Sequence, residues 1–154
     1  EPAAKTQVLS VNPLALVFAG LSGEYERRTG DATAFAIGAS VWGDEGLDYV
    51  SGDLKFRFYP SGEALRGFSV AGTAGYARVN EDMFLDDCLF DCVDDGGDAI
   101  TAGVELNYQW LLGRERNFAV TLGGGAKRLF FLGDEVEDAS VGVPTLRLSI
   151  GYAF

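Results

Sequence analysis

The last ten residues of the chain, 145–154, alternate strictly between two kinds of side chain. Large apolar residues occupy one parity: Leu146, Leu148, Ile150, Tyr152 and Phe154. Small or polar residues occupy the other: Thr145, Arg147, Ser149, Gly151 and Ala153. Successive side chains of a β-strand point to opposite faces, so this pattern predicts a strand with one apolar and one small or polar face. Chain ends are usually frayed and polar, so an aromatic end inside a strand indicates burial in a larger assembly.

The same two-faced pattern recurs along most of the chain, and almost nothing has helical periodicity. The other predicted strands are residues 8–14, 21–29, 34–41, 50–60, 68–77, 99–111 and 118–127. Pro13 lacks a backbone donor and predicts a strand end or bulge, followed by a tight hairpin near residues 16–20. The alternative is one long bent strand over residues 8–28, which would give seven strands instead of eight.

Composition limits the fold classes that remain. The 154 residues suffice for one domain, residues 1–154. No run of eighteen apolar residues occurs, which excludes a transmembrane helix, whereas a transmembrane strand needs only about ten residues of alternating character. The sequence starts at Glu1 without a methionine, which fits an exported protein after removal of a signal peptide.

The two faces of the predicted strands differ in character. One is rich in large apolar residues, and the other carries Gly38, Gly75, Gly103, Gly123 and Gly125 with many alanines and serines. Alternation alone also suits a soluble, lipocalin-like ligand-binding barrel with its apolar face inside. Glycine and alanine make a poor solvent-facing strand surface, so we favour an apolar face turned to lipid and a small-residue face turned into a narrow lumen.

The predicted lumen face carries nearly balanced charge. Its ionisable members are Glu24, Glu26, Arg28, Asp53, Lys55, Arg57, Glu105, Lys127 and Arg147. An unpaired charge is costly in a cramped interior, so we expect a cross-lumen network of ion pairs that plugs the lumen. Within it, we expect Arg147 to point toward one of the acids Glu24, Glu26, Asp53 or Glu105.

These features resemble the small outer-membrane β-barrels of bacteria. The terminal strand resembles the closing strand of that family, which implies an assembly signal at Leu148, Ile150, Tyr152 and Phe154 for the barrel-assembly machinery. The whole pattern resembles the OmpA-type and OmpX-type barrels, while residues 11–14 and 24–27 resemble less characterised outer-membrane barrel families. The resemblance implies an all-β, eight-stranded antiparallel up-and-down barrel in the bacterial outer membrane, in contact with lipid and lipopolysaccharide. Single-chain barrels have even strand numbers, which favours eight over seven.

In such a barrel the last strand descends to the periplasm, and this assigns every connection to a side. Residues 30–32, 60–66 and 112–116 become inner turns, and residues 1–6 a periplasmic tail. Residues 43–48, 80–98 and 132–141 become outer loops, of which 80–98 is the longest. Short periplasmic turns with longer extracellular loops are typical of these barrels.

The three outer loops are strongly acidic. They hold most of the chain's 23 acidic residues and no lysine or arginine, so the net charge of −11 belongs largely to the outer end. A solvated acidic surface is the simpler interpretation, and calcium binding through Asp91, Asp94, Asp95 and Asp98 is the alternative. Cys88 and Cys92 lie in the same loop and predict a disulfide, because the chain has no histidine to share a metal site with them.

The sequence predicts no enzymatic activity and, apart from calcium in that alternative, no cofactor. Outer-membrane barrel enzymes are similar to one another in relying on a histidine, which this chain lacks. The acidic exterior also disfavours nucleic acid as a partner. We therefore expect envelope structure or surface interaction, with a protein partner, cations or lipopolysaccharide at the outer loops. A narrow channel or small-solute transporter is the alternative.

Overall fold

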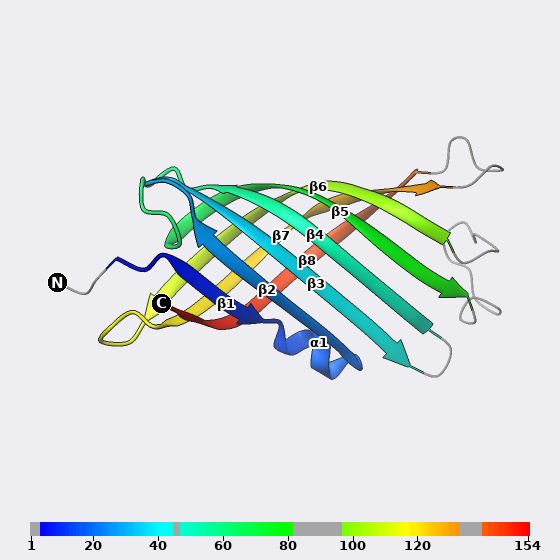
Figure 1. Cartoon of the computed structure of the whole chain (residues 1–154), viewed down its shortest axis with the longest axis horizontal. Helices are drawn as coiled ribbons and strands as arrows, with labels where there is room; N and C mark the ends of the chain where they lie inside the picture. Colours follow the sequence, from blue (N-terminus) through cyan, green and yellow to red (C-terminus); the bar gives the residue numbers. More distant parts are fainter. Residues whose placement is uncertain (1–3, 45–46, 82–96, 133–139) are drawn as a thin grey trace.

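The computed structural model describes residues 4–44, 47–81, 97–132 and 140–154. Its elements are β1 (Gln7–Val11), α1 (Pro13–Val17), β2 (Gly20–Arg28), β3 (Thr33–Asp44), β4 (Leu47–Phe58), β5 (Gly67–Glu81), β6 (Gly97–Leu112), β7 (Phe118–Leu132) and β8 (Ser140–Ala153). Each strand pairs antiparallel with the next and β1 pairs with β8, which closes the barrel (Figure 1). The predicted fold class, an eight-stranded antiparallel up-and-down barrel, is confirmed. The seven-strand alternative is wrong, because α1 separates β1 from β2.

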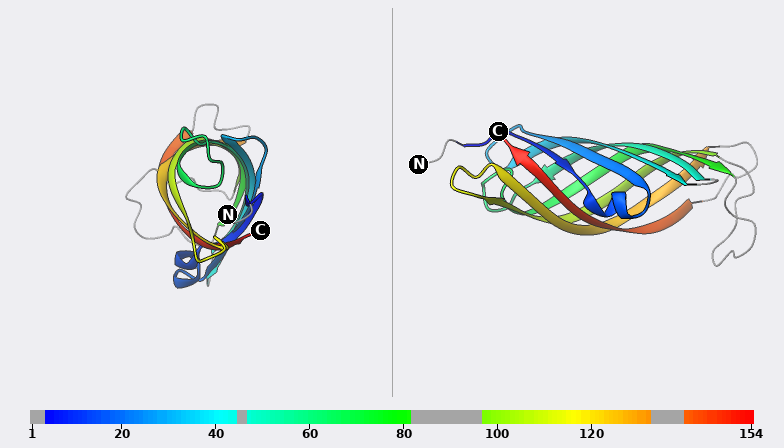
Figure 2. Two further views of the ribbon diagram at one scale, coloured as in Figure 1. Left: turned by 90° about the vertical axis from the view of Figure 1, so that its left-hand side faces the viewer. Right: turned by 90° about the horizontal axis from the view of Figure 1, so that it is seen from below.

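The connection between β1 and β2 differs from the predicted hairpin near residues 16–20. The strand ends before Pro13, as predicted, but α1 follows. The side chain of Asn12 accepts a hydrogen bond of 2.9 Å from the backbone N–H of Leu14, and Pro13 occupies the start of the helix, where its missing donor costs nothing. In Figure 2, α1 lies outside the ring of strands. Within the described residues, no helix is long and apolar enough to cross a membrane.

The strand side chains sort by parity into an inner and an outer set. The inner set is mostly small or polar, and its buried polar members are Ser10, Glu24, Glu26, Ser51, Asp53, Lys55, Arg57, Ser69, Thr73, Thr101, Glu105, Asn107, Gln109, Thr121 and Ser149. The outer set is large, apolar and exposed, as with Phe56, Val104 and Leu146. The apolar face therefore points away from the lumen, which is the opposite of what a lipocalin-like barrel requires.

Small residues on the inner face let neighbouring strands approach closely. A Cβ atom added at Gly125 would lie 2.0 Å from the carbonyl oxygen of Val104 on β6. A Cβ atom at Gly123 would lie 1.9 Å from the side-chain oxygen of Asn107. The glycines of β7 thus serve packing between adjacent strands, in addition to leaving room in the lumen.

The β4–β5 turn folds into one end of the barrel, which we call the inner mouth. Tyr59 and Leu65 are fully buried there and pack with Val8, Ala34 and other apolar residues in a small core. Leu65 adopts a positive φ of 72°, and its carbonyl oxygen accepts a hydrogen bond of 2.8 Å from the side chain of Gln109. This backbone conformation is uncommon for leucine, and the buried packing on both sides holds it in place.

At the opposite end, which we call the outer mouth, the strands run further than the sequence predicts. Asp44 pairs with Leu47, and Asp98 lies within β6 as the register partner of Arg78. The predicted outer loops are shorter as a result. The backbone of the polar residues that follow the alternating pattern still pairs with the neighbouring strand, so the strands continue past that pattern.

Candidate functional site

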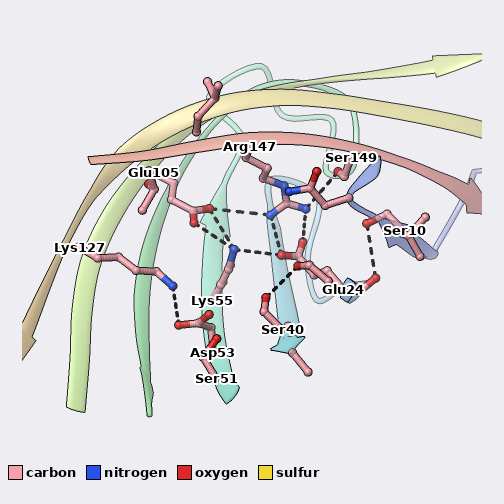
Figure 3. Close-up of a pocket in the computed structure, with 18 of the residues that line it drawn as sticks. Ser10, Glu24, Ser40, Ser51, Asp53, Lys55, Glu105, Lys127, Arg147 and Ser149 are labelled. Atoms are coloured by element: carbon pink, nitrogen blue, oxygen red, sulfur yellow. Dashed lines mark hydrogen bonds and ion pairs between the residues drawn. The ribbon is translucent and has the colours of Figure 1, made fainter. Parts of the chain in front are cut away.

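The centre of the lumen is occupied by the carboxylate of Glu24 on β2. Arg147 of β8 binds it through two hydrogen bonds, 2.6 Å from Nη1 to Oε2 and 2.5 Å from Nη2 to Oε1. Arg57 of β4 donates a further bond of 2.6 Å, and the Lys55 ammonium lies 3.1 Å away. Three cations from two strands thus converge on one carboxylate. Figure 3 shows two of them, Lys55 and Arg147, beside Glu24.

Two further carboxylates extend this cluster. Glu105 on β6 accepts a hydrogen bond of 3.0 Å from Lys55 and lies 3.8 Å from Arg147. Glu26, nearer the inner mouth, accepts bonds of 2.5 Å from Arg57 and 2.7 Å from the Tyr59 hydroxyl. Each cation therefore bridges two acids, which ties β2, β4, β6 and β8 together across the lumen.

Asp53 and Lys127 form a separate ion pair nearer the outer mouth. The Lys127 ammonium lies 2.7 Å from the Asp53 carboxylate, and the Thr101 hydroxyl is 3.5 Å from the same oxygen. In Figure 3 this pair stands apart from the cluster around Glu24. The Lys127 side chain is also more exposed, at 17%, than the 9% of Lys55.

These contacts decide where each predicted lumen charge lies. Arg28 is the member that lies apart: it sits at the β2–β3 turn, where it binds Asp31 at 2.6 Å and the carbonyl oxygen of Gly30 at 3.0 Å. Its parity matches that of Glu26, but it is the last residue of β2 and its side chain contacts the β2–β3 turn instead of the other lumen charges. The other predicted members meet in the two groups around Glu24 and Asp53. Burying charge costs several kcal/mol per ion unless it is paired, and the convergence of opposite charges offsets this cost.

The sequence interpretation omitted Tyr59 and Gln109 from the lumen set. Tyr59 shares the parity of Asp53, Lys55 and Arg57, and this parity is the sequence signal that places its side chain on the lumen face. Its hydroxyl donates to Glu26, and burial together with the Glu26 charge raises the pKa of the phenol. The phenol is therefore held protonated as a donor at the inner mouth.

A cavity of about 220 Å³ remains in the lumen between the Glu24 cluster and the outer mouth. Its charged lining comprises Glu24, Asp53, Lys55, Glu105, Lys127 and Arg147. Serine hydroxyls from β1 to β4 and β8 complete its polar wall, and two of them, Ser22 and Ser40, lie 2.8 Å apart. The cavity offers hydrogen-bond partners and charges of both signs, with a net charge of zero among its ionisable side chains.

Most of the predicted loop ligands lie outside the described residues. These are Cys88, Cys92, Asp91, Asp94 and Asp95. Asp98 is described, and it accepts a hydrogen bond of 2.8 Å from Arg78. No group of three or more potential metal ligands occurs in the described part of the chain.

The residues of the predicted assembly signal lie on the outer face of β8. Ile150, Tyr152 and Phe154 are exposed, and Leu148 is partly so. The rings of Tyr152 and Phe154 stack with centroids 6.2 Å apart. Phe154 also closes the barrel, because its backbone exchanges hydrogen bonds of 2.9 Å with Gln7 of β1.

The geometry defines a class of protein: a closed eight-stranded barrel with an apolar exterior and an interior lined by paired charges. Among solved structures it is similar to the crystal structure of the N-terminal β-barrel domain of Pseudomonas aeruginosa OprF, with a TM-score of 0.52 and 16% sequence identity over 100% of both chains. This similarity shows that the fold is that of an OmpA-type barrel, as the sequence predicts. No family of known proteins matches the sequence, and neither does any curated protein.

Proposed function

We propose that this chain is a non-enzymatic barrel of the bacterial outer membrane with a plugged lumen. Its role is envelope structure or surface interaction through the acidic outer loops. The observation that carries the membrane assignment is the band of large apolar side chains around the outside of the barrel. Soluble monomers rarely expose a contiguous apolar patch of more than a few hundred Å².

The distribution of aromatic residues supports the same assignment. Several lie on the outer face close to the inner mouth: Phe58, Phe68, Tyr108, Trp110, Phe118 and Tyr152. The rings of Tyr108 and Trp110 are in contact, with centroids 4.6 Å apart. Girdles of aromatic residues at the membrane interface are typical of transmembrane barrels.

Two layers support a plugged lumen. The β4–β5 turn fills the inner mouth with Tyr59 and Leu65. Above it, the ion pairs of Arg57 with Glu24 and Glu26 bridge β4 to β2 across the lumen. An eight-stranded barrel has an interior just wide enough for its side chains, so these two layers leave little room for solute.

The membrane assignment is tested by electrophoretic mobility in detergent with and without boiling. A folded transmembrane barrel migrates differently from its boiled form and requires detergent to stay monodisperse. Monodisperse behaviour without detergent would support the soluble ligand-binding alternative instead.

The channel alternative is tested by planar-bilayer conductance. The wild-type protein should show no steady discrete openings. A Tyr59→Ala/Leu65→Ala variant empties the inner mouth but keeps the ion pairs of Glu24 and Glu26, so it tests whether that second layer alone closes the lumen. Steady openings of the wild-type protein would contradict the plugged lumen and favour a narrow channel.

A further inference from the structure

The barrel wall is incomplete where β1 ends. β1 has five residues, whereas its neighbours β2 and β8 have nine and fourteen. The pairing of β1 with β8 stops at Val11 and Ile150, and its pairing with β2 stops at Asn12, whose N–H donates to Ser22. Toward the outer mouth from this point, β8 has no β1 partner among the described strands.

The free edge of β8 carries backbone groups of defined direction. Gln7 and Phe154 exchange both backbone bonds, so the even-numbered residues of β8 direct their N–H and C=O toward β1. Leu148, Leu146 and Pro144 continue this row beyond the end of β1. Pro144 has no N–H, and a proline on a free edge reduces the number of unpaired donors.

The helix α1 lies beside this gap. It contacts both β2 and β8, and only Ala15 within it is fully buried. Leu16, Val17 and Phe18 are 62–75% exposed on the outside of the barrel. We call the gap between α1 and β8 the seam.

The lumen cavity reaches the seam. Besides its charged lining, the cavity is bordered by Val11, Asn12, Thr145 and Leu146, which are the residues at the two sides of the gap. Val11 and Leu146 have side chains exposed on the outer face of the barrel. The Thr145 hydroxyl is buried, points inward by its parity and has no hydrogen-bond partner among the described residues. The lumen cavity thus borders, at the seam, residues whose side chains lie on the apolar exterior.

We propose that the seam binds one phospholipid with a zwitterionic phosphoethanolamine head group, the head in the cavity and the acyl chains against Val11, Leu146 and α1. The cavity lining has no net charge, which suits a zwitterion better than an anionic head. The separate Asp53–Lys127 pair offers each end of the head its counter-charge, the ammonium to Asp53 and the phosphate to Lys127. The Thr145 hydroxyl supplies the unused donor at the seam. This inference rests on the proposed membrane location.

Native mass spectrometry of the folded protein in micelles containing palmitoyl-oleoyl-phosphatidylethanolamine tests the proposal. The wild-type protein should retain one lipid, and Thr145→Phe, which fills the cavity at the seam, should retain none. Thr145→Val should bind the lipid about threefold to tenfold more weakly, the loss expected for one hydrogen bond. Thr73→Val is the matched control, because Thr73 is also an inward threonine with an unpartnered hydroxyl but does not line the cavity; its affinity should be unchanged.

The outcomes separate this inference from the proposed function. Equal retention by wild type and Thr145→Phe means that only surface lipid is bound, and overturns the seam site while the heat-dependent mobility shift still supports the membrane barrel. If Thr145→Phe does not fold, equal affinities of Thr145→Val and Thr73→Val overturn it. If the protein retains palmitoyl-oleoyl-phosphatidylglycerol equally well, the proposed preference for a zwitterionic head group is wrong. A wild-type protein without the mobility shift overturns the membrane assignment itself.

Discussion

The guanidinium of Arg147 on β8 donates two hydrogen bonds, of 2.6 and 2.5 Å, to the carboxylate of Glu24 on β2. The two strands flank β1, so this bidentate pair joins the barrel wall across the strand that is too short to do so. Paired, planar contacts of this kind are the stronger class of ion pair. The pair therefore belongs to the lumen network and also helps to hold β8 and β2 together where the barrel closes.

Replacing Arg147 with glutamine should lower the free energy of unfolding. Glu24 would lose two hydrogen bonds to a charged donor but keep Arg57 and Lys55, so we expect a loss of about 1.5–3 kcal/mol, measured by urea unfolding in phospholipid vesicles. Arg66→Gln is the control, since Arg66 pairs with Glu63 at an exposed site and its loss should cost less than about 1 kcal/mol. Equal effects of the two substitutions would show that Arg147 does not contribute to closure.

Parity in the sequence correctly assigns residues to the inner or outer face, because the two-residue period of a strand is fixed by geometry. It therefore places Glu24, Lys55 and Arg147 in the lumen. Parity does not give the height of a residue along the barrel, which depends on the register between strands. This is why parity groups Arg28 with Glu26, although Arg28 ends β2 and its side chain contacts the β2–β3 turn.

Two other features depend on tertiary packing and could not be read from the sequence pattern. α1 takes the place of the predicted hairpin: Asn12 caps it, Pro13 starts it and Ala15 is buried against the barrel, although a hairpin would also have suited the spacing. The β4–β5 turn enters the inner mouth because Leu65 packs on residues from other strands. The sequence marks Pro60 and Gly62 as turn residues, but not the direction in which the turn folds.

Gly125→Ala should destabilise the barrel. The added Cβ atom would meet a backbone carbonyl of β6 at 2.0 Å, and a backbone atom held in a ladder has little freedom to move. Overpacking of this kind costs about 1–3 kcal/mol. The loss should appear as a lower urea midpoint and a smaller heat-shifted fraction on electrophoresis.

Gly72→Ala is the matched control on β5. A Cβ atom there meets nothing within 4 Å. The substitution should change the free energy of unfolding by no more than about 0.5 kcal/mol. A loss as large as that of Gly125→Ala would mean that strand glycines matter for flexibility and not for the close approach of β6 and β7.

Tyr59→Phe should destabilise the inner mouth. The substitution removes the 2.7 Å hydrogen bond to Glu26 and leaves a buried carboxylate oxygen without that donor. Such a loss costs about 1–3 kcal/mol, measured by urea unfolding at neutral pH. Tyr152→Phe is the control: its hydroxyl only accepts a bond of 3.2 Å from Asn117 at the exposed face, and little change is expected.

The same pair of proteins gives a prediction for alkaline pH. Burial, and next the Glu26 charge, raise the pKa of Tyr59 in the folded state above its value in the unfolded chain, so the folded state holds this proton more tightly. The stabilisation from Tyr59 is then fully present below the unfolded pKa of about 10 and is lost progressively as the pH rises above it. Phenylalanine has no proton to lose, so the difference in unfolding free energy between wild type and Tyr59→Phe should narrow above pH of about 10. Lysine titration affects both proteins alike and cancels in this difference. A difference that stays constant to pH of about 11 would show that the Tyr59 phenol is not shifted by the fold.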